Sequence, residues 1–293
     1  MSNLERGHAV IYRARRTSEH MALALFCGVI LFFLNSFIVT EQAIPNEVLR
    51  RVVQLVFAVI RLGVPVTAFA YMQKKAGFEA LVIEKRSECS VKYNITLAFA
   101  GFVAIFIFGM VYSVAFPMAA SGFCDKSIGS AVITVSSSVI VPAVFEELLY
   151  RRLICRELTV HGSAFAVIIS ALLFGLAHFS FYTFPYAFVC GIILGFVYVK
   201  TGSVKYTLAI HFANNMLGYI FSVLSAHMDK LDYTNMMMLV VIALGVLLLG
   251  AFYALVPNKR KFAMCENGNV SSSVFLTFPM VVYLFCAVLM NFI

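Results

Sequence analysis

Nine apolar runs, each near the length of a membrane-spanning helix, divide the sequence. A helix needs about 20 mainly apolar residues to cross the hydrocarbon core of a bilayer. The runs predict an all-α fold, a polytopic transmembrane helical bundle with eight or nine spans. The second run fits least well because Arg50, Arg51 and Arg61 interrupt it. The runs lie at 21–40, 48–72, 94–117, 128–150, 163–181, 186–200, 204–225, 236–256 and 273–293.

The composition agrees with a membrane protein and disfavours other classes. The chain is 62% hydrophobic and 12% charged, whereas soluble domains are nearer to half apolar and a quarter charged. The net charge of +8 would suit a nucleic-acid-binding protein. Its cations lie at the ends of apolar runs, however, which indicates membrane topology and no nucleic-acid partner. The seven cysteines include no Cys-x-x-Cys pair, so neither a zinc cluster nor a disulfide framework is predicted.

The distribution of Lys and Arg predicts the orientation of the chain. If the N-terminus lies in the cytoplasm and the spans alternate, most cations fall on the cytosolic side, and the outside loops keep only Lys126 and Lys230. This is the positive-inside pattern of a multi-pass integral membrane protein. We expect a single integral membrane domain over residues 1–293, with a motif-bearing core at about 128–225 between flanking helices at 21–117 and 236–293.

Four charges interrupt the apolar stretch VPAVFEELLYRRLI. Glu147 and Arg151 are four residues apart, so they are expected to pair on one helix face, and Arg151 and Arg152 are expected near the cytoplasmic interface. Glu146 lies about 100° around the helix from Glu147 and has no basic residue one turn away. A carboxylate without a cation in apolar surroundings suits a general base. Pro142, one turn earlier, is expected to kink the helix.

Two further motifs place histidines inside apolar runs. They are Phe174-x-x-x-His178 and His211-x-x-x-Asn215. A single histidine in an apolar helix is more often a packing residue, but two of them with an asparagine indicate a functional site, because polar groups are costly in a membrane.

The spacing of Glu146 and His178 brings these two residues together. They are equally far from residue 162, and the sequence HGS at 161–163 predicts a turn there. In an antiparallel hairpin both residues then lie at one depth, provided that the first helix continues past Arg151. His211 is expected at a shallower depth, so that a tilt or a longer helix must bring it to the site.

Two chemistries fit these residues. Glu146, His178 and His211 match the ligand number of a catalytic zinc site. The same residues with Asn215 match a metal-free site in which glutamate activates water and the other groups stabilise an oxyanion. No His-Glu-x-x-His or Gly-x-Ser-x-Gly motif is present, so both alternatives stay open, with no cofactor required and zinc as the alternative.

Together the motifs resemble those of the CPBP family of CAAX-processing and bacteriocin-processing intramembrane proteases, also called the Abi family. The resemblance covers about residues 141–215. It implies a helical membrane protease whose site opens to the cytosol, with Glu146 activating water and His178 helping to hold it. It further implies an oxyanion hole of His211 and Asn215, and a supporting pair, Glu147 and Arg151.

The implied substrate is a membrane-associated peptide or protein, lipidated or not, and the lipid bilayer is the second partner. For Arg61 the favoured interpretation is a snorkelling arginine in an interfacial or tilted helix, and binding of a substrate carboxylate is the alternative. Gly191 and Gly195 predict close helix packing. Some members of the family act as scaffolds or regulators, so a non-catalytic membrane regulator or bacteriocin-immunity protein is the alternative. A transporter is disfavoured because no paired broken helices are apparent.

Overall fold

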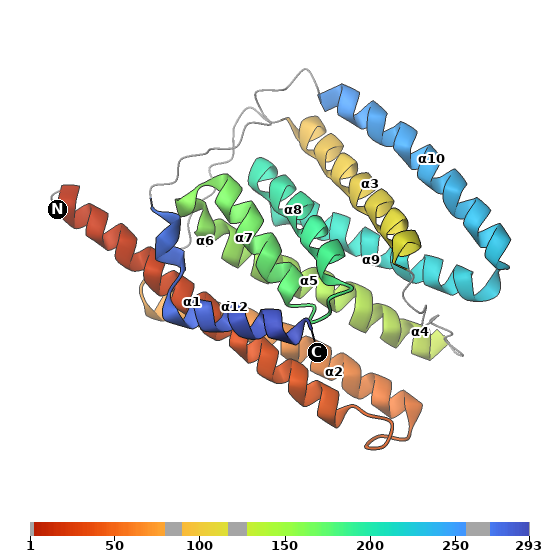
Figure 1. Cartoon of the computed structure of the whole chain (residues 1–293), viewed down its shortest axis with the longest axis horizontal. Helices are drawn as coiled ribbons and strands as arrows, with labels where there is room; N and C mark the ends of the chain where they lie inside the picture. Colours follow the sequence, from red (N-terminus) through yellow and green to blue (C-terminus); the bar gives the residue numbers. More distant parts are fainter. Residues whose placement is uncertain (1–2, 80–89, 117–127, 256–269, 293) are drawn as a thin grey trace.

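The chain folds into a bundle of helices, and residues 3–79, 90–116, 128–255 and 270–292, which the computed structural model describes, include no β-strand (Figure 1). Each of the nine predicted apolar runs overlaps a helix. The all-α fold class is therefore confirmed.

The first two helices pair with each other, and the last helix lies along the first (Figure 1). They are α1 (Asn3–Ile38), α2 (Glu47–Lys75) and α12 (Phe278–Met290), the last preceded by the short 3₁₀ turn η5 (Ser272–Phe275). Helix α1 begins long before the predicted start at residue 21. The arginines of the second run do not break α2. Arg51 pairs with Glu47 at 2.9 Å and donates to the hydroxyl of Thr134 at 2.9 Å.

The motif EELLYRR lies on one continuous helical stretch, Ile128–His161. Two of its segments have the wider π-helical turn, so that the N–H of Val141, for example, bonds to the carbonyl of Ser136, five residues earlier. This widening directly precedes Pro142, where the hydrogen-bond ladder was expected to be disturbed. The segments are α4 (Ile128–Val135), η1 (Ser136–Ile140), α5 (Val141–Glu146), η2 (Glu147–Cys155), α6 (Arg156–Leu158) and η3 (Thr159–His161).

This stretch ends eleven residues beyond the predicted end at 150. The continuation past Arg151 is what the hairpin with His178 required. Arg151 is buried within the protein, whereas Arg152 is exposed; the expected position of both at the cytoplasmic interface stays a prediction. The helix face that carries Arg151 is turned inward, and Ile154, Cys155 and Leu158 on the following turns also pack into the core.

The chain reverses at the predicted turn, where Gly162 has a φ of 105°. Helix α7 (Ser163–Leu176) follows and packs closely against α8 (Phe184–Thr201). A Cβ atom on Gly191 would lie 2.9 Å from the Cα of Ala171, and one on Gly195 would lie 3.3 Å from Val167. These two glycines therefore allow the close approach that their spacing predicts.

The remaining helices complete the bundle on the other side of α8 (Figure 1). They are α3 (Val91–Ala115), α9 (Val204–His227) and α10 (Lys230–Leu255). Helix α3 packs on α8, α9 and α10, and α9 also contacts the motif-bearing stretch. The motif-bearing stretch is thus packed against α2, α7 and α9.

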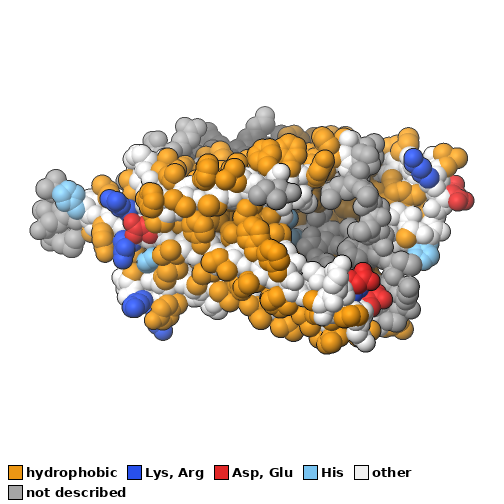
Figure 2. All heavy atoms as spheres, turned by 60° about the horizontal axis from the view of Figure 1, so that its bottom comes forward, with side chains coloured by type: hydrophobic (Ala, Val, Ile, Leu, Met, Phe, Trp, Pro, Cys, Tyr) orange, Lys and Arg blue, Asp and Glu red, His pale blue; other side chains and the backbone are white. Residues whose placement is uncertain are grey.

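Seven helices of the described residues are long and apolar enough to cross a membrane, and α7 and α12 are shorter apolar helices. The count of eight or nine spans is not confirmed. In Figure 2, apolar side chains cover the middle of the visible face and charged side chains gather toward its two ends, as expected for a protein in a bilayer. The cytoplasmic N-terminus stays a prediction, and Lys85, Arg86, Lys126, Lys259, Arg260 and Lys261, on which it partly depends, lie outside the described residues.

Candidate active site

Glu147 is the centre of a buried ionic cluster. Its Oε1 lies 3.2 Å from Nη1 of Arg151 and 2.9 Å from Nδ1 of His211. The side chains of Glu147 and Arg151 are 0% and 1% exposed. The predicted ion pair is therefore confirmed, and the contact with His211, which helical spacing does not reveal, is added to it. The Arg151 contact is an ion pair without an aligned hydrogen bond.

Phe174 contacts both this ionic cluster and His178. The Arg151 guanidinium lies over its ring at 4.4 Å from the centroid, a cation–π contact. The rings of His178 and His211 meet the same phenyl ring edge-on, at centroid distances of 5.0 and 5.9 Å. Phe174 therefore contacts the arginine and both histidines.

Glu146 faces a different side of the helix from Glu147, as the 100° rotation predicts. Its side chain is 12% exposed, and its Oε2 lies 3.7 Å from Nε2 of His211. This distance is too long for a hydrogen bond, so the carboxylate is not held by the ring. Glu146 keeps acceptor capacity toward the cavity that it lines.

His178 does not lie inside a helix, contrary to the predicted run at 163–181. Helix α7 ends at Leu176, and His178 belongs to the turn that follows. Its Nδ1 lies 2.9 Å from the carbonyl oxygen of Phe174. Because a carbonyl only accepts, Nδ1 carries the proton, and in the neutral ring Nε2 then has the free lone pair.

The predicted site residues line two adjoining cavities. The first, of about 160 Å³, is lined by Arg61, Glu146, Phe174 and His178 among others. The second, of about 100 Å³, is lined by Phe174, His178, His211, Asn214 and Asn215 among others. Glu146 and His178 thus share a cavity as their spacing predicted, although the contact found for Glu146 is with His211. His211 was expected at a shallower depth than Glu146 and His178, but its side chain lines the second cavity together with His178.

Arg61 extends from α2 into the first cavity. Its guanidinium lies 5.7 Å from the ring centroid of Phe32, and the described residues offer it no carboxylate partner within ion-pair distance. The aliphatic wall of the cavity includes Leu25, Leu62 and Leu149. An unpaired cation therefore faces the same space as Glu146.

The zinc alternative was tested on the geometry of its ligands. No group of three His, Cys, Asp or Glu side chains converges as metal ligands would in the part of the chain that the structure describes. The ligand set of Glu146, His178 and His211 is therefore not assembled in this conformation. The contact of Nδ1 of His211 with Glu147 leaves Nε2 free, so this contact does not itself exclude His211 as a ligand.

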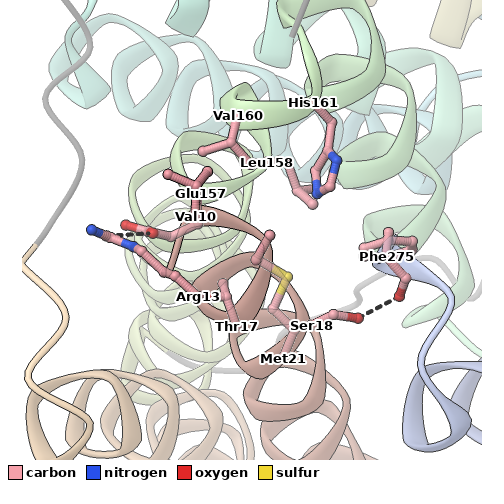
Figure 3. Close-up of a pocket in the computed structure, with 11 residues that line it drawn as sticks. Val10, Arg13, Thr17, Ser18, Met21, Glu157, Leu158, Val160, His161 and Phe275 are labelled. Atoms are coloured by element: carbon pink, nitrogen blue, oxygen red, sulfur yellow. Dashed lines mark hydrogen bonds and ion pairs between the residues drawn. The ribbon is translucent and has the colours of Figure 1, made fainter. Parts of the chain in front are cut away.

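A separate cavity of about 220 Å³ lies between α1 and the end of the motif-bearing stretch (Figure 3). Arg13 and Glu157 on its wall contact each other at 3.1 Å, and His161 turns its Nδ1 to the carbonyl of Ser271 at 3.1 Å. None of the predicted site residues lines it. The charged groups in Figure 3 are engaged with one another, so this cavity is not the candidate active site.

Fold and site together define a polytopic helical membrane protein with a glutamate–histidine site inside its bundle. Residues 128–217 match the family model described as type II CAAX prenyl endopeptidase Rce1-like. The matched segment contains all three motifs and so confirms the resemblance to the CAAX-protease family. No curated protein and no solved structure matches the chain.

Proposed function

We propose that this chain is an intramembrane endopeptidase that hydrolyses a peptide bond by means of a glutamate-activated water. The observation that carries the proposal is the shared cavity of Glu146 and His178, directly adjoining the cavity of His211 and Asn215. An acid–base pair beside two polar groups can supply the general base and the oxyanion donors for hydrolysis of an amide by water. The family match supports a CAAX-type protease in general.

In this mechanism a water molecule lies between Glu146 and Nε2 of His178. Glu146 takes a proton from the water as the water oxygen attacks the scissile carbonyl carbon. The carbonyl becomes an oxyanion, to which the Asn215 amide donates. The His211 ring donates as well through Nε2–H in its doubly protonated form, because its Nδ1–H is directed at Glu147. Glu146 then returns the proton to the leaving amine, which breaks the C–N bond and restores the carboxylate.

Glu147 and Arg151 act in this proposal through His211. The 2.9 Å contact to Glu147 fixes the imidazole plane, and Arg151 balances the buried negative charge of Glu147. Neither side chain is exposed to the cavity in which Glu146 lies. We assign them a supporting role.

The substrate in this proposal is a membrane-associated peptide or protein, lipidated or not. A larger, mainly apolar cavity of about 440 Å³ shares Thr183, Tyr186 and Asn214 with the cavity of His211. It offers room for an apolar part of the substrate next to the reacting bond. Arg61 lines the cavity of Glu146, and in this proposal it binds a substrate carboxylate.

The test compares purified protein in detergent or proteoliposomes with its Glu146→Gln variant, using peptides identified by comparing membrane peptides from wild-type and Glu146→Ala cells. General base catalysis typically contributes about 10² to 10⁴ in rate, so cleavage should fall by at least that factor. Glu41→Gln, on an exposed turn, is the matched control and should keep full activity. Unchanged cleavage by Glu146→Gln would exclude the proposed role. Full complementation by Glu146→Ala cells would favour the non-catalytic regulator.

A further inference from the structure

The C-terminal end of α12 is hydrogen-bonded to the turn that carries His178. Asn291 accepts a hydrogen bond from the backbone N–H of Ser180 at 3.0 Å. Its Nδ2 donates to the carbonyl of Leu176 at 3.0 Å and to the carbonyl of Ala287 at 2.8 Å. The side chain is 7% exposed. One buried amide therefore joins both ends of the turn 176–180 to α12.

The turn has one local hydrogen bond at the Leu176 carbonyl and one strained residue. The carbonyl of Leu176, the last residue of α7, accepts the N–H of Phe179 at 3.2 Å, and the Asn291 amide adds a second hydrogen bond to it. Phe179 has a φ of 48°, the left-handed region that a bulky residue rarely adopts and that costs free energy unless the surroundings hold it. Packing of the Phe179 ring on Phe32, at a centroid distance of 4.7 Å, is a second support.

We propose that Asn291 is a positioning residue that holds His178 in the active site. His178 lies between the two backbone groups that Asn291 binds, Leu176 and Ser180. With the turn fixed, Nδ1 of His178 reaches the Phe174 carbonyl, and Nε2 stays free for water. Asn291 lies outside the segment matched by the family model, so this contribution comes from the C-terminal helix. The catalytic consequence rests on the proposed function, but the positioning itself does not.

The test measures the reactivity of His178 with diethyl pyrocarbonate in membranes, by peptide mass spectrometry. His227 is an internal reference, because its Nδ1 also contacts the carbonyl four residues earlier, at 2.8 Å, and it is exposed. In Asn291→Leu, which keeps the side-chain size but loses the hydrogen bonds, the ratio of His178 to His227 modification should rise roughly tenfold. Asn235→Leu, at an exposed position of α10, should leave the ratio unchanged.

On a cleaved substrate, Asn291→Leu should lower kcat roughly tenfold and leave KM unchanged, because positioning of His178 matters in the transition state. If Asn291→Leu does not accumulate in membranes, Asn291→Asp carries the same comparison, since it keeps the acceptor for Ser180 but loses both donors. A modification ratio equal to that of the wild type would overturn the proposal. So would a rise in KM with kcat unchanged. Because the modification needs no catalysis, failure of Glu146→Gln to affect cleavage would refute the proposed function alone.

Discussion

Glu147 and His211, 64 residues apart in the chain, are joined by a buried contact of 2.9 Å between Oε1 and Nδ1. The same carboxylate oxygen pairs with Arg151 at 3.2 Å. One oxygen therefore connects the helix of the EExxxR motif to α9. The adjacent carboxylate, Glu146, has no such bond and faces the cavity. The two neighbouring glutamates therefore have different surroundings, as the proposed division of roles between them requires.

This division predicts opposite effects for the two glutamates. Glu147→Ala leaves Arg151 buried without its counter-charge, which typically costs about 3–5 kcal/mol, so thermal unfolding in detergent should occur at a clearly lower temperature. Glu146→Ala should unfold near the wild-type temperature. Per folded molecule, Glu146→Ala should lose more activity than Glu147→Ala. Equal unfolding temperatures for the two variants would contradict the division.

Asn215 is predicted to act on the oxyanion. Removal of one oxyanion donor typically costs about 10² to 10³ in kcat, and we expect a loss of that size for Asn215→Ala with little change in KM. Asn214→Ala is a control for kcat alone. The Asn214 amide donates to the hydroxyl of Tyr186 at 2.9 Å and lines the cavity proposed for the substrate, so that its loss is expected to change KM and not kcat. Steady-state kinetics on one peptide would compare them. Equal losses of kcat in both variants would argue against a specific role for Asn215.

The sequence predicts the site as far as helical spacing reaches. The pairing of Glu147 with Arg151, the turn at Gly162 and the shared cavity of Glu146 and His178 all follow from residue intervals and are found in the structure. Spacing says nothing about contacts between distant helices. The contact between Glu147 and His211 depends on how α9 packs, and no local sequence pattern predicts it.

Helix ends were the least predictable part of the fold. Hydropathy places them where charges begin, but Arg151 is buried and the helix continues to His161. Conversely, the apolar sequence after Leu176 suggests more helix, whereas the chain turns there and Phe179 adopts a positive φ. That turn is held by Asn291, more than a hundred residues away. Tertiary contacts of this kind override local hydropathy.

The close packing of α7 and α8 predicts a cost for enlarging Gly191. In Gly191→Ala the new methyl group would meet the Cα and Cβ of Ala171 at 2.9 Å and Phe174 at 3.2 Å. Overpacking of this kind typically costs about 1–3 kcal/mol, and the shift of Phe174 should also lower activity. Gly245→Ala, where nothing lies within 4 Å, should be neutral or slightly stabilising. Thermal unfolding of both variants in one detergent checks this difference.

Metal dependence is predicted from the donor geometry. Because the described residues form no group of three convergent ligands, we expect cleavage to persist after treatment with 1,10-phenanthroline or EDTA. Elemental analysis of the active protein should find less than one metal ion per chain. Loss of cleavage on chelation with recovery on zinc addition would instead support the ligand set Glu146, His178 and His211.

Arg61 provides the last prediction, because its charge faces the cavity of Glu146 without a carboxylate partner among the described residues. If it binds a substrate carboxylate, Arg61→Gln should raise KM for a peptide with a free C-terminus by roughly 10- to 100-fold, the usual contribution of a hydrogen bond to a charged group. The same peptide with a C-terminal amide should already bind weakly to the wild type, and Arg61→Gln should change its KM little. The variant should keep its fold, since the contact it loses with Phe32 is a cation–π contact at 5.7 Å. Equal effects of Arg61→Gln on both peptides would leave Arg61 as a snorkelling arginine of α2.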